Sequence, residues 1–138
     1  EYNEAIEEMS PYMDTLPENQ SKGMCYFVRS RAYRKIGMLE ECMTDSERMI
    51  DVDPDNKWSY YNLALALSTS TLGKYDEAKL VCTKALDIDP SDDFFLYLRG
   101  YCLIQTGDKT RGLEDLSAAI EINPKNANAK RLLKDHVD

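Results

Sequence analysis

The sequence predicts an all-α solenoid of antiparallel helix pairs. Pro54, Pro90 and Pro124 close three similar segments at spacings of 36 and 34 residues, a period that is typical of stacked helical repeats. A glycine precedes each proline by 17 residues, at a place where two helical runs join through a tight turn. Apolar residues on both sides of each glycine recur at three-, four- or seven-residue spacing, as one buried helix face requires. Each repeat should therefore consist of a helix, a turn, a second helix and a proline.

The first element along the chain, residues 2–17, is expected to be the second helix of an incomplete repeat (1–17). Four of its residues hold the same places before Pro17 that a matching set holds before Pro90. The two sets are Tyr2, Ala5, Met9 and Tyr12, and Tyr75, Ala78, Cys82 and Ala85. Because the first helix of this repeat is missing, we predict that the chain is a fragment of a larger protein.

Three complete repeats follow, over residues 23–56, 57–92 and 93–126. Their second helices carry mostly small residues where two helices approach closely. The middle repeat has two extra residues between Leu67 and Gly73, so either its first helix is extended or its turn is longer. The first repeat has polar residues at positions that are normally apolar or small, and we expect it to be the least stable. These residues are Arg29, Ser30 and Ser46.

The last element, residues 127–138, is predicted to be a capping helix. It has one apolar face, which would pack on the last repeat, and a charged outer face that would keep the array soluble. Its basic residues, with the lysine just before it, are expected to pair with helix ends and to face solvent. These residues are Lys125, Lys130, Arg131 and Lys134.

Residues 23–124 resemble the tetratricopeptide repeat (TPR) family, whose pattern is W-x2-L-G-x2-Y, then A-x3-F, then P, over 34 residues. The closest match is Tyr60-x2-Leu63-Ala64-x2-Leu67, Ala78-x3-Cys82 and Pro90. In the last repeat the matching residues are Gly100, Leu103, Gly112, Leu116 and Pro124. The resemblance implies a single domain with a right-handed superhelical fold. It also implies that the first helices line a concave groove, which binds peptides or extended partner segments in this family.

The composition argues against nucleic acids and membranes as partners. Lys and Arg number 17 against 25 Asp and Glu, and the resulting net charge of −8 would repel a phosphate backbone. No apolar run approaches the roughly 18 residues that a membrane span needs. The four cysteines form no C-x-x-C pair and have no histidine nearby, so they are expected to be buried thiols in a reducing compartment. We therefore predict a cytoplasmic location.

No catalytic residue, cofactor site or metal site is predicted. The only histidine, His136, lies two residues from the end, so no triad or histidine-metal site can be built around a fixed imidazole. Acidic pairs precede two of the prolines, but they lack the further oxygen ligands and the central glycine of a calcium loop. These pairs are Asp51 with Asp53, and Asp87 with Asp89. The chain is therefore predicted not to be an enzyme.

A second stripe along the first helices is the predicted partner-binding groove. Its residues recur at i, i+3, i+7 and i+10, on a helical face that is offset from the core face. They are Met24, Phe27, Arg31, Arg34, Trp58, Tyr61, Leu65, Phe94, Tyr97, Tyr101 and Ile104, and Asn62 lies beside them. The rings offer large, rigid contact area, and the arginines add positive charge. We therefore predict a protein or peptide partner with apolar anchors and acidic residues.

One subset of the family binds the C-terminal carboxylate of heat-shock chaperones with lysines, asparagines and an arginine. The matching places here hold Phe27, Arg31, Asn62, Phe94 and Leu98, and Asn62 alone fits that pattern. We therefore predict no useful affinity for chaperone tails. The alternative function is structural: the repeats would pack on the parent protein, or self-associate through the incomplete N-terminal repeat, whose apolar side needs a neighbour.

Overall fold

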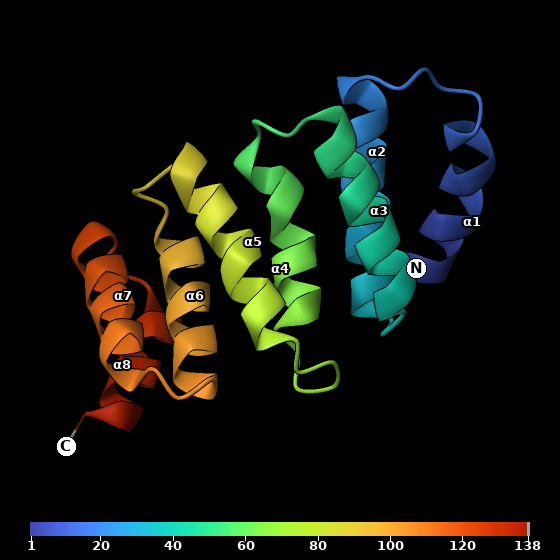
Figure 1. Ribbon diagram of the computed structural model, residues 1–138. Coiled ribbons are helices and arrows are strands. Elements are labelled where there is room, and N and C mark those ends of the chain that lie inside the picture. The colour runs from blue at the N-terminus through green and yellow to red at the C-terminus, as the bar shows by residue number, and fades with distance from the viewer. Residues whose placement is uncertain (138) are drawn as a thin grey trace. The chain divides into compact units, whose positions relative to one another are not determined.

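The computed structural model describes residues 1–137, which form eight α-helices, one short 3-10 helix and no strand (Figure 1). The helices are α1 (Tyr2–Met13), α2 (Gln20–Lys35), α3 (Leu39–Val52), the 3-10 helix η1 (Lys57–Tyr60), α4 (Tyr61–Leu67), α5 (Tyr75–Ile88), α6 (Asp93–Gln105), α7 (Lys109–Ile122) and α8 (Ala127–His136). Backbone contacts divide the chain into two compact units, Glu1–Ala66 and a second that begins at Leu67.

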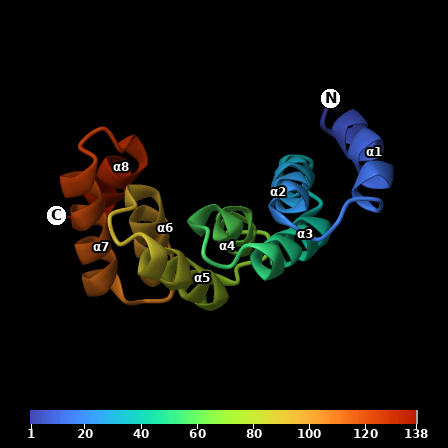
Figure 2. The ribbon, with the colours of Figure 1, turned by 90° about the horizontal axis from the view of Figure 1, so that it is seen from above.

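In the first unit, α2 packs against α3 as a helical pair, and α1 packs on α2 (Figure 2). The core of this unit gathers Met13 from α1, Tyr26 from α2 and Met49 from α3, with Phe27 packed against them. In the second unit, α6 packs against both α5 and α7, and α8 packs on α7. The apolar faces predicted for these helices therefore become the two cores.

The turns within the helix pairs depend on the predicted glycines. Gly37 and Gly107 have φ values of 82° and 93°, a left-handed conformation that side-chain-bearing residues rarely adopt. In each case the residue after the glycine donates its backbone N–H to a carbonyl in the preceding helix, from Met38 to Tyr33 and from Asp108 to Leu103, both at 2.9 Å. These bonds satisfy carbonyls that the helix end would otherwise leave unpaired.

The extra residues of the middle repeat lie in its turn. Residues 68–74 connect α4 to α5, whereas residues 36–38 and 106–108 suffice in the other two pairs. Of the two arrangements that the sequence allowed, the structure has the longer turn. The extra length is held by backbone bonds, from Gly73 N to Thr69 O at 2.7 Å and from Lys74 N to Leu67 O at 3.0 Å.

Two helices are shorter than expected. The predicted helix over residues 2–17 ends at Met13, and Thr15 and Leu16 donate to Tyr12 O and Met13 O in a turn instead. The proline at 17 disfavours a helical conformation at the residue before it, which is consistent with this early end. At the other end of the chain, α8 stops at His136 rather than at residue 138, and the last predicted position lies outside the described residues.

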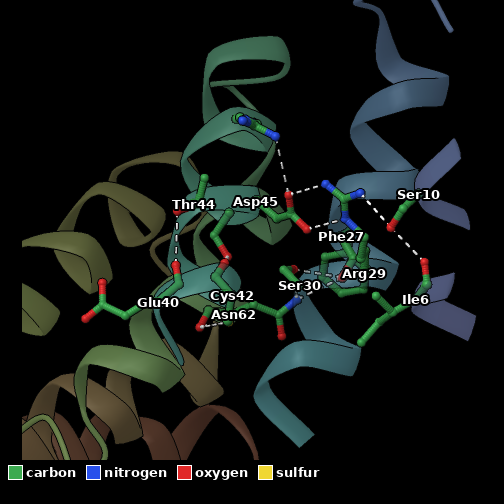
Figure 3. Close-up of polar contacts among 12 residues, drawn as sticks. Ile6, Ser10, Phe27, Arg29, Ser30, Glu40, Cys42, Thr44, Asp45 and Asn62 are labelled. Carbon is green, nitrogen blue, oxygen red and sulfur yellow. Dashed lines mark hydrogen bonds and ion pairs between the residues drawn. The ribbon is translucent and has the colours of Figure 1, made fainter. Parts of the chain in front are cut away.

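A buried ion pair ties α2 to α3. Arg29 Nε donates to Asp45 Oδ2 at 2.6 Å and Arg29 Nη2 to Asp45 Oδ1 at 2.7 Å, with the two side chains only 11% and 3% exposed. The hydrogen bonds to Asp45 raise the pKa of Arg29 above its ordinary value. Arg29 Nη1 also donates to Ser10 Oγ at 3.1 Å, and Ser10 donates to Ile6 O at 2.7 Å (Figure 3). This hydroxyl–arginine–aspartate relay joins α1, α2 and α3.

The same relay recurs in the second unit. Arg99 Nε and Nη2 donate to Asp115 Oδ2 and Oδ1 at 2.7 and 2.9 Å, and Arg99 Nη1 donates to Thr83 Oγ1 at 3.4 Å. The relay therefore joins α5, α6 and α7 as it joins the first three helices. Arg29, which departs from the usual apolar pattern, is thus fully paired rather than an isolated defect of the first repeat.

Two helices of the second unit, α6 and α7, approach each other closely at Gly100 and Gly112. A Cβ atom added at Gly100 would lie 2.9 Å from the backbone oxygen of Gly112 and 3.2 Å from the Leu116 side chain. Both glycines are buried, and Ile104 lies over Gly112. The small residues predicted at these repeat positions therefore allow the two backbones to touch.

Candidate partner-binding surface

An apolar pocket of about 350 Å³ lies in the first unit, at residues of the predicted stripe. It is lined by Met24 and Phe27 of α2, Met49 of α3, and Asn56 and Trp58 at the start of the next helical segment. Met24 is 57% exposed and Trp58 is 46% exposed, high values for large apolar side chains. The pocket brings together three residues that the sequence predicted for the groove.

Two of the lining residues were not predicted. Met49 belongs to the core face of α3, and its buried side chain lines the pocket. Asn56 comes from the turn between repeats, two residues after Pro54. The stripe includes only residues of the first helices, so it could not select Met49 or Asn56. The sequence does mark the turn that carries Asn56, because this residue follows the repeated proline by two positions.

Trp58 is positioned by the turn that precedes it. Asn56 Oδ1 accepts from Trp58 N at 3.0 Å, which starts the 3-10 helix. Two residues that follow anchor the same turn: Ser59 Oγ donates to Asp53 O and Tyr60 OH donates to Pro54 O, both at 2.7 Å. The backbone that carries the indole is therefore fixed on both sides.

The rings around the pocket also contact one another. Tyr61 lies between Trp58 and Phe27, with ring centroids 5.6 Å and 6.2 Å away and tilted ring planes. Lys57 Nζ lies 5.2 Å from the centroid of the Trp58 ring, within range of a cation–π interaction. These contacts hold the rings in place without burying them, since Phe27 and Tyr61 are half-buried and Trp58 is exposed.

The other predicted residues of the first unit divide between surface and interior. Arg31 is exposed, and Arg34 and Leu65 are half-buried. Asn62 is a correction to the predicted groove, because it is buried and only 1% exposed. Its Nδ2 donates to Phe27 O at 3.1 Å and to Ser30 Oγ at 2.9 Å, and its Oδ1 accepts from Arg34 Nε at 3.4 Å. One step along a helix turns a side chain by about 100°, so Asn62 faces α2 while the Tyr61 ring contacts the rings of Trp58 and Phe27.

The second unit carries its own group of half-buried stripe residues. The ring centroids of Phe94 and Tyr97 lie 6.5 Å apart. The Tyr101 ring meets the Tyr75 ring of α5 edge-on, with centroids 5.9 Å apart. Burial and the hydrogen bond with Tyr75 raise the pKa of Tyr101 to about 12, so this phenol stays protonated at neutral pH. Ile104 is half-buried, and its side chain packs over Gly112 of α7. A single groove that runs through both units stays a prediction.

Three of the four cysteine thiols are buried. Burial raises the pKa of Cys42 to about 11 and that of Cys102 to about 12, and it raises that of Cys82 as well, so these thiols are poor nucleophiles at neutral pH. Within residues 1–137, no three ligating side chains gather to hold a metal ion. Over the same residues, no helix has the length and apolar character that crossing a bilayer requires.

Comparison with curated proteins gives relatives that contain a similar segment. The chain is 30% identical over 115 residues to anaphase-promoting complex subunit 3 of Dictyostelium discoideum, covering 83% of this chain and 12% of that protein. It is 31% identical over 111 residues to Hsp70-Hsp90 organizing protein 3 of Arabidopsis thaliana, covering 80% of this chain and 19% of that protein. The chain therefore spans less than a fifth of the length of either relative.

Solved structures share the fold. MamA from Desulfovibrio magneticus RS-1 superposes with a TM-score of 0.86 at 16% identity, over 98% of this chain and 73% of that one. The first TPR domain of Spaghetti (RPAP3), bound to the HSP90 peptide SRMEEVD, superposes with a TM-score of 0.79 at 22% identity, over 84% of this chain and 90% of that one. Sequence patterns of the tetratricopeptide repeat match residues 25–56, 47–79 and 71–135. The chain is an all-α solenoid and belongs to the tetratricopeptide repeat family.

Proposed function

We propose that the chain is a non-catalytic protein-binding module whose first-unit pocket holds an apolar side chain of an extended partner segment. The observation that carries this proposal is the apolar pocket of about 350 Å³ with Trp58 and Met24 exposed at its walls. Large aromatic residues in such positions dominate the energetics of many interfaces. The pocket is large enough for a leucine, methionine or phenylalanine side chain.

The pocket is also organised before any partner arrives. The turn around Asn56 fixes the backbone of Trp58, and Tyr61 supports the indole from one side. Binding therefore costs little side-chain ordering, which leaves more of the contact energy as affinity.

Similar proteins support a protein or peptide as the partner. One relative is named as a subunit of a complex and another as an organizing protein, and one structural neighbour holds a peptide. The four free cysteines, three of them buried, support the predicted cytoplasmic location, because buried thiols persist in a reducing compartment.

Trp58→Ala is expected to weaken partner binding about tenfold or more, because it removes one wall of the pocket. Peptides selected by phage display on the unmodified chain provide the ligands, and fluorescence anisotropy provides the dissociation constants. Val28→Ala is the matched control, since Val28 is an apolar residue of the same unit that is 42% exposed and does not line this pocket. Equal affinity of the Trp58→Ala chain, with helical content preserved in both variants, would refute the pocket assignment.

The peptide SRMEEVD, which the Spaghetti domain binds, is expected to show no saturable binding to this chain at concentrations up to about 100 μM. Phe27, Phe94 and Leu98 supply no charge at three of the five places that hold a chaperone tail in the family, and the amide of Asn62 is already used inside the fold. Isothermal titration calorimetry measures this directly. A dissociation constant in the low micromolar range would contradict the expectation.

A second candidate function is assembly through α1. This helix exposes Tyr12, and a second apolar pocket of about 190 Å³ lies between α1 and α2, lined by Met9, Met13, Leu16 and Cys25 together with Glu8 and Tyr12. Light scattering separates the two candidates. A monomer at high concentration favours the peptide-binding function, and an oligomer that Tyr12→Ala disperses favours assembly.

A further inference from the structure

The arginines of residues 1–137 divide into those that have a carboxylate partner and those that have none. The first group is Arg29 with Asp45, Arg48 with Asp45, Arg99 with Asp115 and Arg111 with Asp108. Arg31 and Arg34, on the predicted stripe, have no carboxylate partner among residues 1–137. Arg131 of α8 belongs to this second group, although the basic residues of α8 were expected to pair with helix ends and to face solvent.

The start of α8 is tied to the start of α6. Asn123 Nδ2 and Asn126 Nδ2 donate to Asp93 Oδ2 at 3.0 and 2.8 Å, and α8 contacts α6 directly (Figure 2). Arg131 follows Tyr97 by 34 residues, which is one repeat. Because both helices start from the same anchor and run in the same direction, Arg131 takes the place beside Tyr97 that the next repeat would give to a stripe residue.

The guanidinium of Arg131 has a hydrogen-bond acceptor but no ion-pair partner among residues 1–137. Its Nη2 donates to Asn128 Oδ1 at 3.1 Å, and within the described residues no carboxylate lies at ion-pair distance from it. The side chain is exposed. Burial raises the pKa of Tyr97, and the positive charge of Arg131 partly opposes this rise, so the cation acts on that ring. An exposed cation, oriented by Asn128, therefore lies near Tyr97, one ring of a half-buried aromatic pair.

We infer that Arg131, oriented by Asn128, binds a carboxylate side chain of the partner segment while the adjoining apolar group packs on Phe94 and Tyr97. The guanidinium presents paired N–H donors that suit a carboxylate, and the rings beside it supply the apolar contact. The inference deepens the proposed function, on which it rests, by adding α8 to the binding surface and an acidic residue to the partner. It requires only residues of the second unit.

Two small ligands test the site without knowledge of the partner. The probes are 3-phenylpropionate, which has one ring and one carboxylate, and the neutral 3-phenylpropionamide, both titrated at millimolar concentration and followed by NMR chemical shifts. The unmodified chain is expected to bind the acid about two- to fivefold more tightly than the amide, the range of an exposed ion pair. Equal affinities would overturn the inference.

Arg131→Gln is expected to abolish the preference for the acid, whereas Lys134→Gln is expected to leave it unchanged. Both changes remove one positive charge from an exposed residue of α8, so a loss in both variants would show general charge attraction and would overturn the inference.

Arg131→Gln should also raise the pKa of Tyr97, because the opposing cation is gone. NMR titration with labelled tyrosine measures this pKa, and an unchanged value would contradict the stated geometry.

Failure here is distinguishable from failure of the proposed function. Trp58→Ala changes the first unit only, so it should leave the acid preference intact. If Trp58→Ala loses peptide binding and the unmodified chain shows no acid preference, the Arg131 site is refuted and the pocket assignment is supported. If Trp58→Ala keeps peptide binding and the unmodified chain prefers the acid, the pocket assignment is refuted and the Arg131 site is supported.

Discussion

Replacing Asp45 by valine is expected to destabilise the chain by about 3–5 kcal/mol, the cost of leaving a buried charge without its partner. Arg29 is held by two short hydrogen bonds from its guanidinium to Asp45. The arginine cannot lose its proton at any accessible pH, so the variant must either bury an uncompensated cation or move α2 and α3 apart. Urea denaturation followed by circular dichroism gives the change in the free energy of unfolding.

The double variant Arg29→Leu with Asp45→Val is the control that the chain itself suggests. In the middle repeat these two repeat positions hold Leu63 and Val81. Replacing a buried ion pair by apolar residues is often close to neutral, so the double variant should recover to within about 1 kcal/mol of the unmodified chain. A single variant that costs less than about 1 kcal/mol, or a double variant as unstable as the single one, would contradict this account.

Gly100→Ala is expected to destabilise the second unit by roughly 2–3 kcal/mol, near the upper end for overpacking. The new Cβ would meet the backbone oxygen of Gly112 at 2.9 Å, and a backbone atom cannot move away as the end of a flexible side chain can. The substitution also gains helix propensity of about 1 kcal/mol, so a net loss means that the collision outweighs this gain.

Gly23→Ala is the matched control in another helix. Its added Cβ would lie 3.4 Å from Val52 Cγ1, an ordinary contact, so the gain in helix propensity should dominate. We expect Gly23→Ala to be neutral or to stabilise the chain by about 0.5–1 kcal/mol. Thermal denaturation of both variants measures the contrast, and equal effects would show that the close approach of α6 and α7 has no energetic weight.

Much of the fold could be predicted because its determinants are local. The glycines of the turns and the prolines after the second helices act within a few residues of the chain, and a fixed period multiplies a weak signal. The end of α1 was harder to place. The prediction ran it to residue 17, but the turn after Met13 depends on hydrogen bonds of Thr15 and Leu16 that the helical pattern does not reveal.

The candidate site was predictable only in part, since pockets depend on distant residues. The stripe rule selected Met24, Phe27 and Trp58 because all three lie on one helical face in each repeat. It placed Asn62 on the surface, although the close approach of α2 turns that amide inward. It also omitted Met49, whose place in the pocket follows from the packing of α3 rather than from its own segment.

The relay of Ser10, Arg29 and Asp45 has a consequence for folding accuracy. Repeats with similar apolar faces are prone to pair with the wrong neighbour, a common route to misassembly in repeat proteins. The middle repeat holds Leu63 and Val81 at the positions of Arg29 and Asp45, so it offers the guanidinium no carboxylate. Pairing α2 with the second helix of the middle repeat would therefore bury an unmatched positive charge, which makes this wrong assembly costly while the apolar contacts alone would tolerate it.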